Sequence, residues 1–171
     1  MKATDSNDIA ANNVFVPDHL VFPLMPSREP NKYFDAPLYR FATVGISVPT
    51  MIAPVALAVA ANAIREVKSM ATKKTPMGST QSMRDKGVVQ RKLGMAEAAV
   101  QSSRAFLYQT LSETWKKALA GERQSGEEKA TLLLCGVHTV QSCLQAIELM
   151  YSVAASRAIY RKDKVSHYFM D

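Results

Sequence analysis

The sequence has little glycine and few cysteines, and both shortages narrow what the chain can be. Seven of its 171 residues are glycine and nine are methionine, a composition that favours helices. The two cysteines, Cys135 and Cys143, are eight residues apart on one predicted helix. They therefore stand about 12 Å apart along its axis, too far for a disulfide. Free cysteines and the lack of a signal peptide predict a cytoplasmic protein.

Motifs that carry catalysis or bind metals are also missing. The sequence has no HExxH, GxSxG, P-loop or GxGxxG motif, and no CxxC pair or Cys/His cluster. His138 stands alone on a predicted helix, and we interpret it as a packed or surface residue. We therefore expect no catalytic and no metal-binding residue in this chain.

The positive charge of the chain permits an anionic partner without selecting one. The formal net charge is +6, which suits nucleic acid, a membrane surface or a phosphate-bearing cofactor. The lysines and arginines are spread along the sequence rather than gathered in one block, so we expect solvated helix faces and no nucleic-acid partner.

One uncharged run, residues 41–64, has nearly the length of a membrane span. It contains Pro49 and Pro54, several polar residues and many alanines, which add little transfer energy into lipid. A buried helix of a soluble bundle explains the run better, so we expect no membrane partner. A membrane-inserted helix hairpin is the alternative.

The chain consists of two segments that differ in composition and periodicity. Residues 1–38 contain prolines and short extended runs, which we interpret as the remnant of a β domain and a linker. Residues 39–171 show helical periodicity, and short breaks join the helices. The first expected helix ends near Thr72, the second spans about 82–119, and the third spans about 127–160. A fourth helix is expected to start near Val165. We therefore predict an all-α fold, an up-down bundle of long antiparallel helices preceded by a short β remnant.

Apolar or small residues recur at alternating spacings of four and three, which predicts one packing face on each long helix. On the second helix this face comprises Val89, Leu93, Ala96, Val100, Ser103, Leu107, Leu111 and Thr114. On the third helix it comprises Leu133, Val137, Val140, Leu144, Ile147, Tyr151, Ala154 and Ala158. Ser125 is the expected N-cap of the third helix, with Glu127 and Glu128 in its first turn. Pro49 and Pro54 should kink or split the first helix.

Two places have a composition that suits a ligand. The break at residues 73–80 (KKTPMGST) combines Lys73 and Lys74 with three hydroxyls, a set that can hold a phosphate. An ordinary exposed turn has the same composition. The end of the third helix combines Ala154 and Ala155 with Ser156, which would let a backbone or a flat ligand approach. Tight packing between helices explains these small residues equally well.

Several segments, taken in order, resemble the acyl-CoA dehydrogenase superfamily, and most closely its flavin-dependent monooxygenases. The similar segments are SNDI and VFVP at the end of the family's middle β domain, the KKTPMGST break, residues 89–108 in the second bundle helix, and ASRAIYR with HYFMD at residues 155–171. The resemblance covers nearly the whole chain.

The resemblance implies a flavin cofactor, FAD or FMN. It places Lys73 or Lys74, with Thr75 beside them, near the flavin phosphates, where many relatives have arginine; lysine keeps the charge but loses the bidentate fork. It places Ala154, Ala155, Ser156 and Arg157 near the flavin, where relatives often have Gly-Gly.

The resemblance also implies a function. It implies the flavin-pocket and oligomerisation portion of an oxidoreductase that forms homotetramers and acts on a small-molecule substrate. The expected reaction is hydroxylation of a small aromatic compound with reduced flavin and O2, and the chain alone is expected to be incomplete. The alternatives are a fragment of an acyl-CoA dehydrogenase and an inactive helical module that only self-associates.

Overall fold

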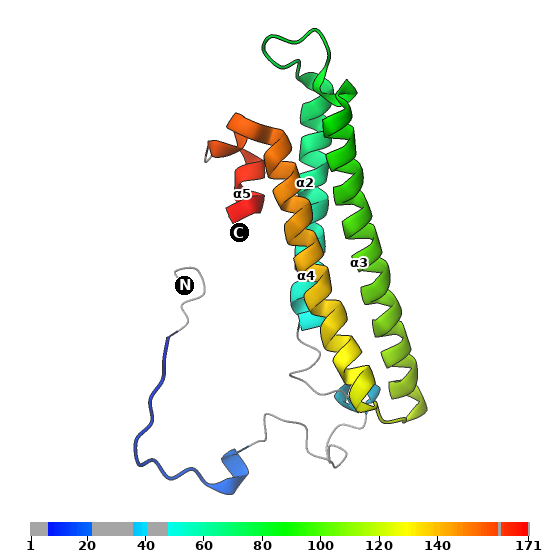
Figure 1. The fold of residues 1–171 in the computed structure, drawn as a ribbon. Coiled ribbons are helices and arrows are strands. Elements are labelled where there is room, and N and C mark those ends of the chain that lie inside the picture. The colour runs from blue at the N-terminus through cyan, green and yellow to red at the C-terminus, as the bar shows by residue number, and fades with distance from the viewer. Residues whose placement is uncertain (1–6, 22–35, 41–47, 161, 171) are drawn as a thin grey trace.

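Three long helices form the protein in a computed structural model that describes residues 7–21, 36–40, 48–160 and 162–170 (Figure 1). They are α2 (Ala53–Lys73), α3 (Gly87–Ala120) and α4 (Gly126–Ala154), and the short α5 (Lys164–Met170) packs against α2 and α4. Helix α4 packs on both α2 and α3, and α3 runs antiparallel to the other two (Figure 1). This arrangement confirms the predicted all-α bundle.

Helix α2 begins where the sequence places its prolines. The five residues before it, Val48–Ile52, form a single π-helical turn, η3, in which Pro49 is buried. Pro54 lies in the first turn of α2, where its missing N–H would have no partner in any case. The helix therefore changes from a π-helical to an α-helical turn between the two prolines without a break, and residues 41–47, where the predicted helix would begin, lie outside the described part of the chain.

Helix α3 buries the face that the sequence predicted. Six of the eight predicted positions are buried, and Leu93 and Leu111 are half-buried against the same core. The helix ends at Gly121, whose φ of 74° lets it close the last turn without a side-chain clash. A 3-10 turn, η4 (Met83–Asp85), precedes it, so α3 starts about five residues later than expected.

Helix α4 buries a different face from the predicted one. Leu133, Val137 and Leu144 are 42%, 45% and 51% exposed, whereas the core side consists of smaller residues. The buried residues of α4 are Leu132, Cys135, Gly136, Thr139, Ser142, Cys143, Ala146, Ile147, Met150, Val153 and Ala154. The prediction was wrong for the first half of the helix because small side chains let α4 lie close to its neighbours. Ile147 and Ala154 belong to both faces.

The closest of these approaches is at Gly136. A Cβ built on this glycine would lie 2.9 Å from the backbone nitrogen of Pro49 and 3.0 Å from its Cα. Turn η3 therefore packs directly on the backbone of α4, and only glycine leaves room for it.

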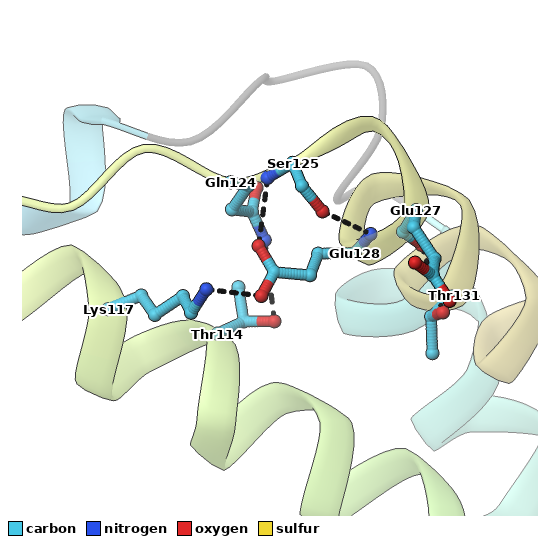
Figure 2. A network of polar contacts seen from close by, with 7 residues as sticks. All are labelled: Thr114, Lys117, Gln124, Ser125, Glu127, Glu128 and Thr131. Atoms are coloured by element: carbon cyan, nitrogen blue, oxygen red, sulfur yellow. Dashed lines mark hydrogen bonds and ion pairs between the residues drawn. The ribbon is translucent and has the colours of Figure 1, made fainter.

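Helix α4 begins with the predicted cap, which Figure 2 shows in detail. The Ser125 hydroxyl accepts a hydrogen bond from the Glu128 N–H at 3.1 Å, and the Glu128 carboxylate accepts one from the Ser125 N–H at 2.8 Å. This reciprocal pair is a capping box. The same carboxylate forms an ion pair with Lys117 of α3, so the cap also joins the two helices.

The segment at residues 7–21 forms no strand in the described part of the chain. It has a bend at Asn13, whose φ is 57°, and a 3-10 turn, η1 (Asp18–Leu20), and its apolar side chains are exposed. A strand requires a neighbouring strand to pair with, and the described residues contain no strand. Its assignment to a β domain, and the boundary at residue 38, remain predictions.

Two helical stretches, residues 48–73 and 126–159, are long and apolar enough to cross a membrane by length and composition. They include α2 and α4, which supply most of the buried core, and core helices of soluble bundles commonly share this property.

Candidate functional site

A strained turn ends helix α4 at the second place that the sequence singled out. Helix α4 was expected to reach Tyr160, but it stops at Ala154 because Ala155 adopts φ 53° and ψ −133°. Positive φ is uncommon for a residue with a Cβ, and glycine adopts it readily. A 3-10 turn, η5 (Ala155–Ile159), follows and changes the direction of the chain.

The four predicted site residues of this turn differ in exposure. Ala154 is fully buried, so it packs beneath the turn rather than on its surface. Ala155, Ser156 and Arg157 are exposed and face outward from the end of the bundle. Ala158, one residue further, is buried again and anchors η5 to the core. Three of the four predicted residues are therefore accessible to solvent.

A buried carboxylate holds the turn in place. The Asp163 side chain is only 6% exposed and forms an ion pair with the Nε of Arg157, whose own side chain is 49% exposed. Its other oxygen accepts a hydrogen bond from the Val165 N–H at 3.0 Å, at the start of α5. Asp163 thus connects the turn after α4 to the helix that follows.

A shallow cleft of about 290 Å³ lies beside this ion pair. Arg157, Tyr160, Lys162 and Asp163 line it. Its lining carries two cations, a phenol and a carboxylate that is already engaged with Arg157. The sequence did not single out Tyr160, Lys162 or Asp163 as site residues. The one available signal was an aspartate directly before a short apolar helix.

The KKTPMGST break forms the connection between α2 and α3. Lys73 is the last residue of α2, and the Lys74 carbonyl accepts a hydrogen bond from the Met83 N–H at 2.8 Å across the base of the loop. Gly78, with φ 73°, allows the tight turn at the tip. Lys73 and Thr75 are exposed and Lys74 is half-buried, so both ammonium groups and the hydroxyl lie at the end of the bundle.

The two predicted places lie at the same end of the bundle (Figure 1). Helices α2 and α4 both run toward that end, and Lys92 of α3 donates a hydrogen bond to Ser152 of α4 there at 2.9 Å. In the described part of the chain, no hydrogen bond or ion pair joins Lys73, Lys74 or Thr75 to the turn after α4. Residues 73–75 and the turn after α4 therefore lie at one end of the bundle but do not contact each other through these polar groups.

The chemistry of these residues fits the phosphate-bearing part of a cofactor. Ammonium and guanidinium groups with nearby hydroxyls are the donors that recognise phosphate. The described residues include no cluster of three or more His, Cys, Asp or Glu able to hold a metal ion. Burial raises the pKa of Cys143 to about 11, so this thiol stays protonated and is a poor nucleophile at neutral pH. The described residues at this end of the bundle therefore offer groups that can bind an anion.

Comparison with known proteins agrees with this description. The family model for the acyl-CoA dehydrogenase C-terminal domain matches residues 50–171. An indole-3-acetate monooxygenase from Acinetobacter baumannii is 24% identical over 171 residues, which is 100% of this chain and 43% of that protein. Its namesake from Pseudomonas putida is 23% identical over 163 residues, 95% of this chain and 41% of that protein.

A solved structure has a similar fold. The crystal structure of 3-HSA hydroxylase from Rhodococcus sp. RHA1 superposes with a TM-score of 0.70 at 15% identity, over 80% of this chain and 35% of that chain. The protein thus spans less than half the length of each of these three relatives.

Proposed function

Because the chain belongs to the acyl-CoA dehydrogenase C-terminal domain family, we propose that it is the flavin-pocket and oligomerisation portion of a flavin-dependent monooxygenase. The complete enzyme would hydroxylate a small aromatic substrate with reduced flavin and O2. The observation that carries this proposal is the match to indole-3-acetate monooxygenases over the whole of the chain. The remaining parts of such an enzyme correspond to the half or more of each relative that this chain does not cover.

The cofactor would be FAD or FMN, and the protein would bind it through one end of the bundle. When bound, the reduced flavin supplies the electrons that activate O2. Lys73 and Lys74 would neutralise the charge of its phosphate, and Thr75 would donate a hydrogen bond to it. Ser156 and Arg157 would contact the cofactor from the turn after α4, which Ala154 supports from below.

The oligomerisation role rests on the exposed apolar face of α4. Leu133, Leu134, Val137 and Leu144 all point away from the core, and they lie within three turns of one helix. Apolar patches of this kind on a soluble helical protein commonly mark an interface. We therefore propose that this face packs against a second copy of the chain within a homotetramer.

Two alternatives follow from the same observations. The family description itself favours the related reaction, dehydrogenation of an acyl-CoA. The exposed face of α4 favours a module that self-associates without binding a cofactor. In each case the buried, unpaired cysteines support the proposal of a cytoplasmic location.

A flavin titration tests the proposal. The purified chain is added to FMN and, separately, to FAD, and the flavin fluorescence is recorded. We expect saturable quenching, and we expect the double variant Lys73→Gln/Lys74→Gln to bind more weakly. The control, Lys116→Gln/Lys129→Gln, removes the same charge from the opposite end of the bundle and should bind like the wild type. Unchanged fluorescence of both flavins at high protein concentration would exclude the flavin role of this chain and leave the self-association module.

Sedimentation velocity tests the oligomer. The variant Leu133→Gln/Leu144→Gln should sediment as a smaller species than the wild type, because polar side chains on that face weaken association. A wild-type chain that sediments as a monomer at all concentrations would refute the proposed interface.

A further inference from the structure

The ion pair between Arg157 and Asp163 leaves part of the arginine available. Asp163 is buried and bonds to the guanidinium through Nε, whereas about half of the arginine side chain remains accessible to solvent. A guanidinium is a planar fork with several donors, so fixing one edge also fixes the direction of the others. Arg157 is one of the residues that line the cleft.

The other groups of the cleft suit the same kind of ligand. Lys162 and Tyr160 line it with Arg157, and both are exposed. Arg157 and Lys162 carry two positive charges against the single negative charge of Asp163, so the four lining residues have a net charge of +1. Because Asp163 already bonds to Arg157 and to the Val165 N–H, it is committed to the fold rather than presented to a cation.

We propose that this cleft binds the terminal oxyanion of a small ligand through Arg157 and Lys162, and that Asp163 is the positioning residue for Arg157. The oxyanion is a phosphate or a carboxylate, since both match the fork of a guanidinium. This inference deepens the proposed function and rests on it, because Arg157 is among the residues proposed to contact the flavin. It adds Lys162 to the contacting residues and gives Asp163 a role that acts through Arg157.

Pairs of ligands that differ only in the anionic group test the inference. FMN and riboflavin differ by a phosphate, and indole-3-acetate and 3-methylindole differ by a carboxylate. For the wild-type chain we expect tighter binding of the anionic member of at least one pair. In Arg157→Gln this preference should fall about tenfold, which is the size of one charge-assisted hydrogen bond to an anion. The circular dichroism spectrum and the unfolding midpoint of Arg157→Gln should match those of the wild type, which shows that the variant is folded.

A matched pair of lysine variants tests the second cation. Lys162→Gln should reduce the same preference, because Lys162 lines the cleft. Lys164→Gln removes an equal charge two residues further, outside the cleft lining, and should retain the wild-type preference.

The variant Asp163→Asn distinguishes a role of Asp163 in positioning Arg157 from a simple effect of its negative charge. Asparagine keeps an oxygen for the Val165 N–H but loses the ion pair. If Asp163 only set the local charge, its neutralisation would tighten anion binding. If it positions Arg157, the preference for the anionic ligand should fall although the site has become more positive. Tighter anion binding in Asp163→Asn would overturn the positioning role.

Failure of this inference can be told from failure of the proposed function. If flavin binds but Arg157→Gln keeps the full preference in both ligand pairs, the cleft proposal is wrong and the flavin role stands. If neither flavin binds the wild type, the flavin role is wrong. Binding of inorganic phosphate, measured by phosphorus NMR, then tests the cleft proposal by itself. Phosphate binding that Arg157→Gln abolishes then supports the cleft. The absence of phosphate binding, together with no preference for indole-3-acetate over 3-methylindole, overturns it.

Discussion

Replacing Gly136 with alanine tests the close contact between η3 and α4. In an ordinary exposed helix this change stabilises by about 1 kcal/mol, because alanine has the higher helix propensity. Here the new Cβ would lie 2.9 Å from the Pro49 nitrogen, 3.0 Å from its Cα and 3.1 Å from its ring Cδ. Two of these atoms are backbone and the third is tied to it by the ring, so none can rotate away.

The magnitude follows from two opposing contributions. Overpacking of a tight contact costs about 1–3 kcal/mol, and the rigid proline favours the upper part of that range. After subtraction of the propensity gain of about 1 kcal/mol, we expect Gly136→Ala to lower the free energy of unfolding by about 1–2 kcal/mol. Urea denaturation followed by circular dichroism measures this difference directly.

Gly94→Ala is the matched control. Gly94 lies within α3, and a Cβ at this position would meet no atom within 4 Å. This variant should raise the free energy of unfolding by about 0.5–1 kcal/mol. The two substitutions should therefore act in opposite directions. Equal stabilisation by both would show that η3 does not pack on α4.

Three further predictions concern other parts of the chain. Ala155→Gly should stabilise by about 1 kcal/mol in urea denaturation, because relief of the positive φ exceeds the entropic cost of glycine; a loss of stability would contradict the strained turn. The hydrogen-bonded ion pair with Lys117 lowers the pKa of Glu128 most, and the hydrogen bond from the Ser125 N–H lowers it further. The carboxylate of Glu128 should therefore stabilise the fold at pH values above the ordinary glutamate pKa, and this stabilisation should disappear as the pH falls through the lowered pKa. The unfolding midpoint of Glu128→Gln should vary less than that of the wild type on acidification, and equal slopes would refute this. Both cysteines are buried, and burial raises the pKa of Cys143 to about 11. Neither cysteine should therefore react with a thiol reagent at pH 7 until the protein is unfolded. Rapid labelling of the native chain would contradict their burial.

The periodicity of the sequence predicts α3 well and α4 poorly, and the difference has a physical cause. On α3 the predicted positions and the buried positions coincide, as at Val100 and Leu107. On α4, Leu133, Val137 and Leu144 lie outside, and the core takes Thr139 and Ser142 instead. The Thr139 hydroxyl is satisfied locally, since it donates to the Cys135 carbonyl at 2.7 Å. Such buried hydroxyls have no signature in hydrophobic spacing.

The candidate site, like the helices, could be predicted from the sequence only in part. The accessibility of the two cations and the hydroxyl of residues 73–75 could be predicted from composition, because exposed loops keep their local character in the fold. The end of α4 at Ala154 could not, since alanine favours helix and nothing in the sequence stops it there. Asp163 was also missed, because its role arises only where the turn after α4 brings Arg157 to it.

The central claim is that one end of the bundle, formed by residues 73–80 and by the turn at residues 154–157, binds flavin. Hydrogen exchange of the chain with and without saturating FMN or FAD tests it most directly. The account predicts that added flavin slows exchange in both segments and leaves residues 121–125, at the opposite end, unchanged (Figure 1). Flavin-dependent protection only at that opposite end, or no protection in either segment, would contradict it.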